Sequence, residues 1–411
     1  MYPNFYFIFK EWFGLELPGL KLINSFGFFV AVSFIVANIV MTKELRRKFK
    51  LGILGAGETI RTMKGIAFSQ ADYITSGITG FIIGYKFIPL IFDFSAVEDN
   101  PQEYILSLQG NMLYGLLGAA ILLGFNYWQD RKQRLAEPIE EFKVVDPSYH
   151  MGSLTFAAFV GGILGAKLFH ILENLSDFQR DPWGSIMSFS GLTFYGGLIV
   201  GGIAVLYVAR KKGIKMLHML DVGGPAMMLA YGTGRIGCHV SGDGDWGIVN
   251  TAPKPGWMSF LPDWTWAYNY PNNVNKVCNP YTEGDINYIM NLGCDFNSTP
   301  YLIAPVFPTP LYEAIACILI FVLLWFLRKR IHYAGVLFGI YLMLNGMERF
   351  FIEKIRVNTI IMEVSGMHIT QAELISMGMF LGGLILTIFC WKLKMLNAAV
   401  PVTHGTPIEE A

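Results

Sequence analysis

Nine long hydrophobic stretches constrain the fold of this chain more than any other feature of its sequence. A transmembrane helix needs about 20 mostly apolar residues. Stretches of that kind occur at 20–41, 71–92, 104–128, 150–172, 189–209, 217–240, 308–327, 334–353 and 372–391. Charged residues make up only 15% of the 411 residues, against about 25% in a typical soluble domain. We therefore predict an all-α polytopic membrane protein with about nine transmembrane helices.

The distribution of basic residues predicts the orientation of these helices. Cytoplasmic loops of membrane proteins are enriched in Lys and Arg. With the N-terminus outside, the cytoplasmic segments hold 20 of the 31 Lys and Arg residues and the outside segments hold six. This predicts an outside N-terminus and a cytoplasmic C-terminus. Because the N-terminus lacks the features of a signal peptide, we expect the first hydrophobic stretch to remain as a transmembrane helix.

We interpret residues 1–411 as a single membrane domain with one sizeable periplasmic loop, 241–307. The density of Trp in that loop predicts a cap that lies at the membrane interface. Cys278 and Cys294 both fall in the loop, where they are candidates for a disulfide. The balance of 31 basic and 31 acidic residues excludes nucleic-acid binding, and the hydrophobic content excludes disorder.

Ionisable residues inside a predicted span are candidates for function, because charge is costly to bury in lipid. The basic ones are Lys21, Lys86, Lys167, Arg235 and Arg349. The acidic residues and histidines in or beside the spans are His170, Asp221, His239, Glu313, Glu348 and Glu353.

The most unusual stretch is Tyr231–Gly247, where the sixth predicted span meets the outside loop. It reads YGTGRIGCHVSGDGDWG. The glycines after Thr233 are expected to break the helix and to leave backbone N–H groups free. Together with the planar cation of Arg235, they predict an anion pocket that suits a phosphate. The alternative is that the glycines form a tight packing elbow.

Two further motifs carry polar residues at the outer ends of spans. Arg349, Glu353 and Arg356 have spacings of four and three, so we expect them on one helical face. Either they pair with one another as an ion-pair ladder, or they offer a second cation to the same phosphate, with Glu353 holding the guanidinium group in place. Tyr195 precedes Gly196 and Gly197 at the start of the fifth span, where glycines favour close helix packing.

These motifs, in this order, resemble the bacterial prolipoprotein diacylglyceryl transferase family. The matching sequences are FYGGLI from Phe194, GRIG from Gly234, SGD from Ser241, WG from Trp246, PTPLYE from Pro308 and RFFIEKIR from Arg349. The similarity covers roughly 20–50 and 150–392, and the segment 51–148 looks like an inserted pair of helices.

The resemblance implies a multi-pass enzyme of the bacterial plasma (inner) membrane. Such enzymes transfer a diacylglyceryl group from phosphatidylglycerol to the lipobox cysteine of a prolipoprotein and release glycerol phosphate. The implied partners are phosphatidylglycerol, a lipobox peptide and membrane lipids, with no cofactor and no metal. Arg235 and Arg349 match the two arginines of the family, and Glu353 matches its acidic residue.

The resemblance and the residues together define the expected site. We expect Arg235 and Arg349 to bind the phosphate and stabilise the leaving group. The further substrate-binding candidates are Gly237, Gly242, Glu353, Arg356, Gly196 and Gly197, and the further catalytic candidates are His239, Tyr195 and Asp243.

The chain departs from the family at the residue that removes the proton of the thiol. Tyr195 stands where the family has His, and a phenol is a poor base at neutral pH. His239 either replaces that base or only caps a helix end. Other departures are Cys238 for Asn, Asp243 for Glu, Phe26 for Tyr and Lys167 for Arg. Two alternatives follow: a divergent paralogue with another acceptor, or a non-catalytic lipid-binding or transport protein.

Overall fold

The computed structural model describes residues 1–54, 58–92, 104, 109–135, 139–187, 193–275, 302, 304–357, 360–364 and 367–392. The described chain is mostly helical and forms two compact units. The larger unit comprises 1–3, 24–56 and 146–411, and the smaller one comprises 4–23 and 57–145. Cys278 and Cys294 lie outside the described residues.

Each of the nine predicted hydrophobic stretches overlaps a helix in the described chain. The helices are α2 (Ser25–Lys50), α3 (Gln70–Phe92), α5 (Met112–Gln133), α6 (Met151–Glu173), α9 (Phe194–Lys211), α10 (Met216–Ser241), α12 (Thr309–Leu327), α13 (Val336–Glu353) and α14 (Gln371–Lys392). Within the described residues, four segments are long and apolar enough to cross a membrane: α2, α12, α14 and Pro147–Glu173, which contains α6. The chain is therefore a helical membrane protein, and nine crossings stay a prediction.

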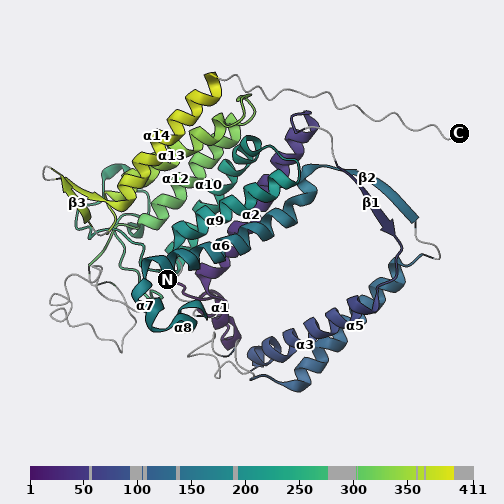
Figure 1. Ribbon diagram of the computed structural model, residues 1–411. Helices are drawn as coiled ribbons and strands as arrows, with labels where there is room; N and C mark the ends of the chain where they lie inside the picture. Colours follow the sequence, from purple (N-terminus) through teal and green to yellow (C-terminus); the bar gives the residue numbers. More distant parts are fainter. Residues whose placement is uncertain are drawn as a thin grey trace. The chain divides into compact units, whose positions relative to one another are not determined.

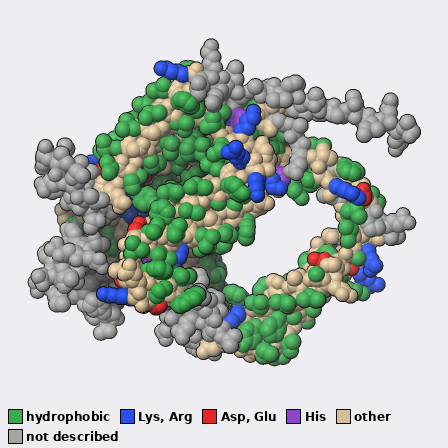
Figure 2. Space-filling view, in the orientation of Figure 1, with side chains coloured by type: hydrophobic (Ala, Val, Ile, Leu, Met, Phe, Trp, Pro, Cys, Tyr) green, Lys and Arg blue, Asp and Glu red, His purple; other side chains and the backbone are tan. Residues whose placement is uncertain are grey.

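The larger unit is built from helices that lie side by side (Figure 1). Within it, α6 packs on α9, α13 packs on α14, and α10 packs on both α2 and α12. Hydrophobic side chains cover much of the outward surface of these helices (Figure 2). Examples with more than half of the side chain exposed are Phe156, Leu164, Ile203, Leu319 and Ile385. An exposed apolar surface of this extent suits contact with lipid.

The expectation that glycines break α10 is wrong. The helix continues through Gly232, Gly234 and Gly237 and ends only at Gly242, which caps it in the left-handed conformation with φ 66°. A Cβ at Gly237 would lie 2.8 Å from the Cβ of Phe29 in α2. One at Gly232 would lie 3.0 Å from the Cβ of Cys317 in α12. Close packing against two neighbouring helices thus compensates for the low helix propensity of glycine.

The smaller unit holds α3, α5, the helix α1 (Phe5–Phe13) and the short 3₁₀ helix at Pro18–Leu22. Glycines let α3 and α5 approach closely, since a Cβ at Gly80 would lie 2.9 Å from the Cβ of Leu122. The strands β1 (Glu58–Lys64) and β2 (Ile139–Val145) pair antiparallel, with Glu58 opposite Val145 and Lys64 opposite Ile139. That 51–148 is an insertion stays a prediction.

The remaining elements of the larger unit are short. They are the 3₁₀ helices Pro147–His150, Gly256–Met258 and Asp263–Thr265, the helices α7 (Leu175–Arg180) and α8 (Pro182–Met187), and the antiparallel strands β3 (Ile360–Val364) and β4 (Met367–Thr370). In the loop after α10, isolated bridges join Val306 to Val249 and Tyr268. Trp246, Tyr270, Leu302 and Val306 form a small buried core there.

The contact between α6 and α9 makes Gly165 sensitive to substitution. A Cβ at this position would lie 2.5 Å from the Cβ of Val200 and closer still to the carbonyl oxygen of Gly196. We expect Gly165→Leu to destabilise the protein by about 3 kcal/mol, as overpacking does. Gly202→Leu is the matched control, because Gly202 is exposed and a Cβ there meets no atom within 4 Å. Thermal unfolding in detergent measures both, and equal melting temperatures would contradict the packing argument.

Candidate active site

A fully buried carboxylate, that of Glu313, lies at the centre of the candidate site. It stands one turn into α12 and is 0% exposed. Its Oε1 accepts hydrogen bonds from Nη1 of Arg349 at 3.3 Å and from Nη1 of Arg356 at 3.4 Å. Its Oε2 forms an ion pair with Nε of Arg235 and accepts a hydrogen bond from the Tyr231 hydroxyl at 3.0 Å. One carboxylate therefore joins three arginines from α10, α13 and the segment after α13.

Two more carboxylates complete the set of ion pairs. Asp245, in the loop after α10, pairs with both Arg235 and Arg356. Glu353 pairs with Arg349 at 3.2 Å and accepts a hydrogen bond from the Thr370 hydroxyl at 2.7 Å. The arginine cluster is defined as Arg235, Arg349, Arg356, Glu313, Asp245 and Glu353. Its three guanidinium groups and three carboxylates balance in formal charge.

The loop that carries Asp245 is fixed to the rest of the site by backbone contacts. The Thr309 hydroxyl donates to the Asp245 carbonyl at 2.7 Å. Gly247 bridges to Arg356, and Ile248 N–H donates to the Ile355 carbonyl at 2.9 Å. Burial acts to raise the pKa of the Asp245 carboxyl, but the charges of Arg235 and Arg356 lower it below its usual value. Asp245 is thus held ionised.

The three arginines of this cluster are mostly buried, and each keeps part of its side chain exposed. The exposed fraction of the side chain is 14% for Arg235, 20% for Arg349 and 13% for Arg356. Asp245 is the most accessible acid of the three at 28%. Guanidinium groups of this kind bind phosphate through paired hydrogen bonds. The arrangement can hold a phosphate and stabilise charge that develops on it.

The structure places Arg356 differently from the sequence prediction. Helix α13 ends at Glu353, so Arg356 lies beyond the helix rather than on one helical face with Arg349 and Glu353. It nevertheless reaches the same cluster through Glu313 and Asp245. The ion pairs are therefore present, and the binding of a phosphate by the same cations stays a prediction.

Asp245, which the sequence does not single out, makes the ion pairs with the arginines, and the predicted Asp243 does not lie in them. Asp243 lies two residues earlier, and its Oδ1 accepts a hydrogen bond from the Asp245 N–H at 3.3 Å. Burial, and then the negative charge of Asp245, raise the pKa of the Asp243 carboxyl. Asp243 supports the turn on which Asp245 sits.

His239 lies among aromatic side chains, one helical turn after Arg235. It is 8% exposed, and its Nδ1 lies 3.2 Å from the Tyr270 hydroxyl. Its ring also stacks on Trp264 at 5.7 Å between centroids. In the described part of the chain it makes no hydrogen bond or ion pair with a member of the cluster. These contacts anchor the loop to the end of α10.

The predicted glycines contribute to packing. A Cβ at Gly196 would lie 2.5 Å from the Cβ of Phe169, and one at Gly197 would lie 3.0 Å from the Gly162 carbonyl oxygen, both in α6. Tyr195 stands beside them in the first turn of α9 and is half-buried. Gly237 packs on α2, and Gly242 caps α10. Their roles in binding substrate stay predictions.

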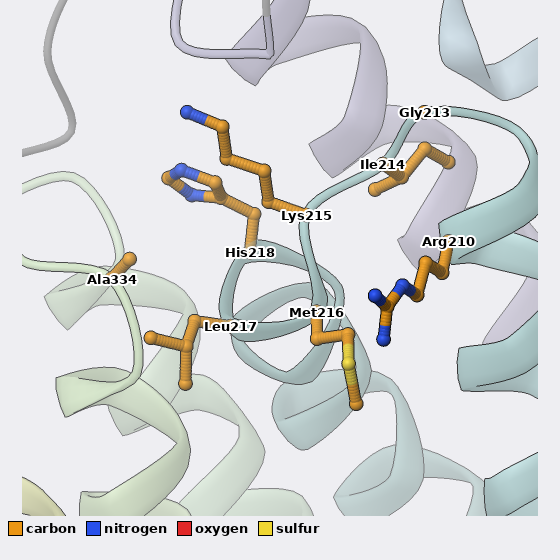
Figure 3. A pocket seen from close by; sticks show the side chains of 8 residues that line it. All are labelled: Arg210, Gly213, Ile214, Lys215, Met216, Leu217, His218 and Ala334. Atoms are coloured by element: carbon orange, nitrogen blue, oxygen red, sulfur yellow. The ribbon is translucent and has the colours of Figure 1, made fainter.

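A cavity of about 530 Å³ lies at the other end of α10, around its first turn (Figure 3). Arg210, Lys215 and His218 line it together with apolar side chains. None of the predicted site residues lines this cavity. The candidate site is therefore defined by the convergence of charged side chains and not by this cavity.

Comparison with known proteins identifies the family. A family model described as prolipoprotein diacylglyceryl transferase matches residues 103–389, which is more than half of the chain. The chain belongs to the prolipoprotein diacylglyceryl transferase family. This confirms the resemblance, and the match contains the whole arginine cluster.

Several curated relatives carry the name phosphatidylglycerol–prolipoprotein diacylglyceryl transferase. The one from Thermus thermophilus is 30% identical over 224 residues, which is 54% of this chain and 71% of the relative. The one from Vibrio vulnificus is 27% identical over 246 residues, 59% of this chain and 75% of the relative. The one from Clostridium tetani is 27% identical over 210 residues, 50% of this chain and 68% of the relative.

Proposed function

We propose that this protein transfers the diacylglyceryl group of phosphatidylglycerol to the lipobox cysteine thiol of prolipoproteins and releases glycerol phosphate. The observation that carries the proposal is the convergence of Arg235, Arg349 and Arg356 on one buried carboxylate. Membership of the family, whose curated relatives are named for this activity, supports it.

The arginines suit the charge that this reaction creates. The phosphate of phosphatidylglycerol carries one negative charge, and the glycerol phosphate that leaves carries two. Arg235 and Arg349 would face the phosphate, and groups that stabilise charge formed in the transition state accelerate the chemical step. Glu313 and Glu353 would hold the guanidinium groups in place before substrate binds.

The proposed setting is the bacterial plasma (inner) membrane, which the chain would cross nine times. The N-terminus would lie outside, the C-terminus in the cytoplasm, and loop 241–307 on the periplasmic side, as the distribution of Lys and Arg favours. The arginine cluster lies at the end of α10 that leads into this loop. This is the side from which an exported prolipoprotein would present its lipobox.

Asp245 pairs with Arg235 and Arg356, so it would compete with an incoming phosphate for the guanidinium group of Arg235. We expect Asp245→Asn to lower the KM for phosphatidylglycerol about threefold or more, because one competing negative charge is removed. Asp243→Asn is the matched control, since Asp243 supports the same turn without pairing with these arginines. Initial rates over a series of phosphatidylglycerol concentrations measure the effect. An unchanged KM in Asp245→Asn, or equal changes in both variants, would contradict this role.

The decisive assay uses the full-length protein in liposomes with labelled phosphatidylglycerol and a lipobox peptide. A thioether-linked diacylglyceryl peptide together with glycerol phosphate supports the proposed function. Glycerol phosphate without modified peptide would instead indicate a paralogue with another acceptor. If neither product forms, the remaining interpretation is a lipid-binding or transport role.

A further inference from the structure

Glu348 is a buried acid of α13, and within the described residues it forms no ion pair with the arginine cluster. Its side chain is 7% exposed. Neither carboxylate oxygen has a hydrogen-bond partner within the part of the chain that the structure describes. The other buried acids differ, since Glu44 pairs with Arg47, Asp221 with Lys48 and Glu373 with Lys354. An ionised carboxylate without a hydrogen bond is costly to bury, so a residue of this kind points to a function.

Helical geometry places Glu348 beside the arginine cluster. Tyr341 and Glu348 are seven residues apart and therefore share one face of α13. Tyr341 on that face belongs to the buried core with Met228 of α10 and Cys317 of α12. Arg349, the next residue, reaches Glu313. The charged and titratable groups that act on Glu348 are Glu313, Arg235, Arg349, Arg356, Tyr231, Cys317 and Tyr341.

The proposed reaction needs a proton acceptor, because the thiolate and not the thiol is the nucleophile. Tyr195 is a phenol, and His239 is enclosed by aromatic rings. The carboxylates of the arginine cluster are already in ion pairs with guanidinium groups. Among the described acids beside the cluster, Glu348 has oxygens that are not committed to a partner. We propose that Glu348 accepts the proton of the lipobox thiol; this assignment rests on the proposed function.

The step balances in atoms and in charge. The S–H bond breaks and its proton passes to the Glu348 carboxylate, while the sulfur electron pair forms the bond to the glyceryl carbon. The bond from that carbon to the phosphate oxygen breaks, and its electron pair leaves with glycerol phosphate. Glu348 becomes neutral as the phosphate gains its second negative charge, so the arginines face the same total charge before and after the step. Release of the proton to water then restores the carboxylate.

The test is Glu348→Gln, which keeps the size of the side chain but cannot accept a proton. We expect kcat at neutral pH to fall about 100-fold, as loss of a general base does. The KM for phosphatidylglycerol should stay within about twofold, because Gln leaves the arginine contacts intact. The deficit should shrink above about pH 8.5, where the free thiol is already ionised and needs no base. Glu348→Asp, which retains a carboxylate, should restore a profile close to that of the wild type.

The matched control is Glu373→Gln, since Glu373 is also buried but is bonded to Lys354 and Thr370. This control should leave the shape of the pH profile unchanged. A wild-type rate in Glu348→Gln overturns the assignment, and so does a loss that is the same at every pH, which would reflect only structure. Absence of transfer by the wild-type protein would overturn the proposed function itself and this assignment with it.

Discussion

Arg235→Ala is expected to abolish the transfer of the diacylglyceryl group while leaving a folded protein. Arg235 lies within helix α10 and pairs with both Glu313 and Asp245. Removing a cation that stabilises a leaving phosphate costs about 1,000-fold or more in rate. We expect kcat/KM in the liposome assay to fall by that factor, with most of the loss in kcat.

Arg235→Lys separates charge from geometry. A lysine keeps one positive charge but cannot reach two carboxylates and a phosphate with a planar, forked group. We therefore expect a loss of about 100-fold. Arg180→Ala is the matched control, because Arg180 is exposed at the end of α7 and belongs to no ion pair in the described chain. A wild-type rate in Arg235→Ala would refute the placement of the phosphate.

The helices were predictable because membrane spans depend on a local property of the sequence. A run of about 20 apolar residues specifies a helix wherever lipid offers no alternative hydrogen-bond partner. The strands β1 and β2 were not predicted, since Glu58–Lys64 pairs with Ile139–Val145, about 80 residues away along the chain. The continuity of α10 was also missed. It depends on Phe29 and Cys317, which pack against Gly237 and Gly232 from other helices.

The arginines of the candidate site were predictable, and its acids were only partly so. Arg235 and Arg349 stand out as charges in apolar segments, and that signal does not depend on the fold. The choice of Asp245 over Asp243 depends on the turn after Gly242, whose direction the sequence does not reveal. The central position of Glu313 depends on how α10, α12 and α13 meet. The signals for Glu313 in the sequence are that it is the sole acid in the apolar helix α12 and that it ends the motif PTPLYE.

Glu313→Gln is expected to have the largest effect on the stability of the larger unit. Glu313 is the common partner of three arginines, and it is 0% exposed. Removing one member of a buried ion-pair set costs about 3–5 kcal/mol, because the charges left behind lose their compensation. The extra positive charge would also attract phosphate more strongly. Loss of orientation should nevertheless dominate the rate, since misplaced cations no longer match the transition state.

Two measurements on the same preparation separate these effects. Chemical unfolding in detergent should show the loss of stability, and the liposome assay below the unfolding temperature should show a kcat at least about 100-fold lower. Glu44→Gln is the matched control, because Glu44 is 1% exposed and pairs with Arg47 and Arg328 away from the arginine cluster. It should lose stability to a similar extent and keep its kcat. If Glu313→Gln kept the wild-type kcat while losing stability, Glu313 would act only in folding, and preorganisation of the arginines would have to come from Asp245 and Glu353 alone.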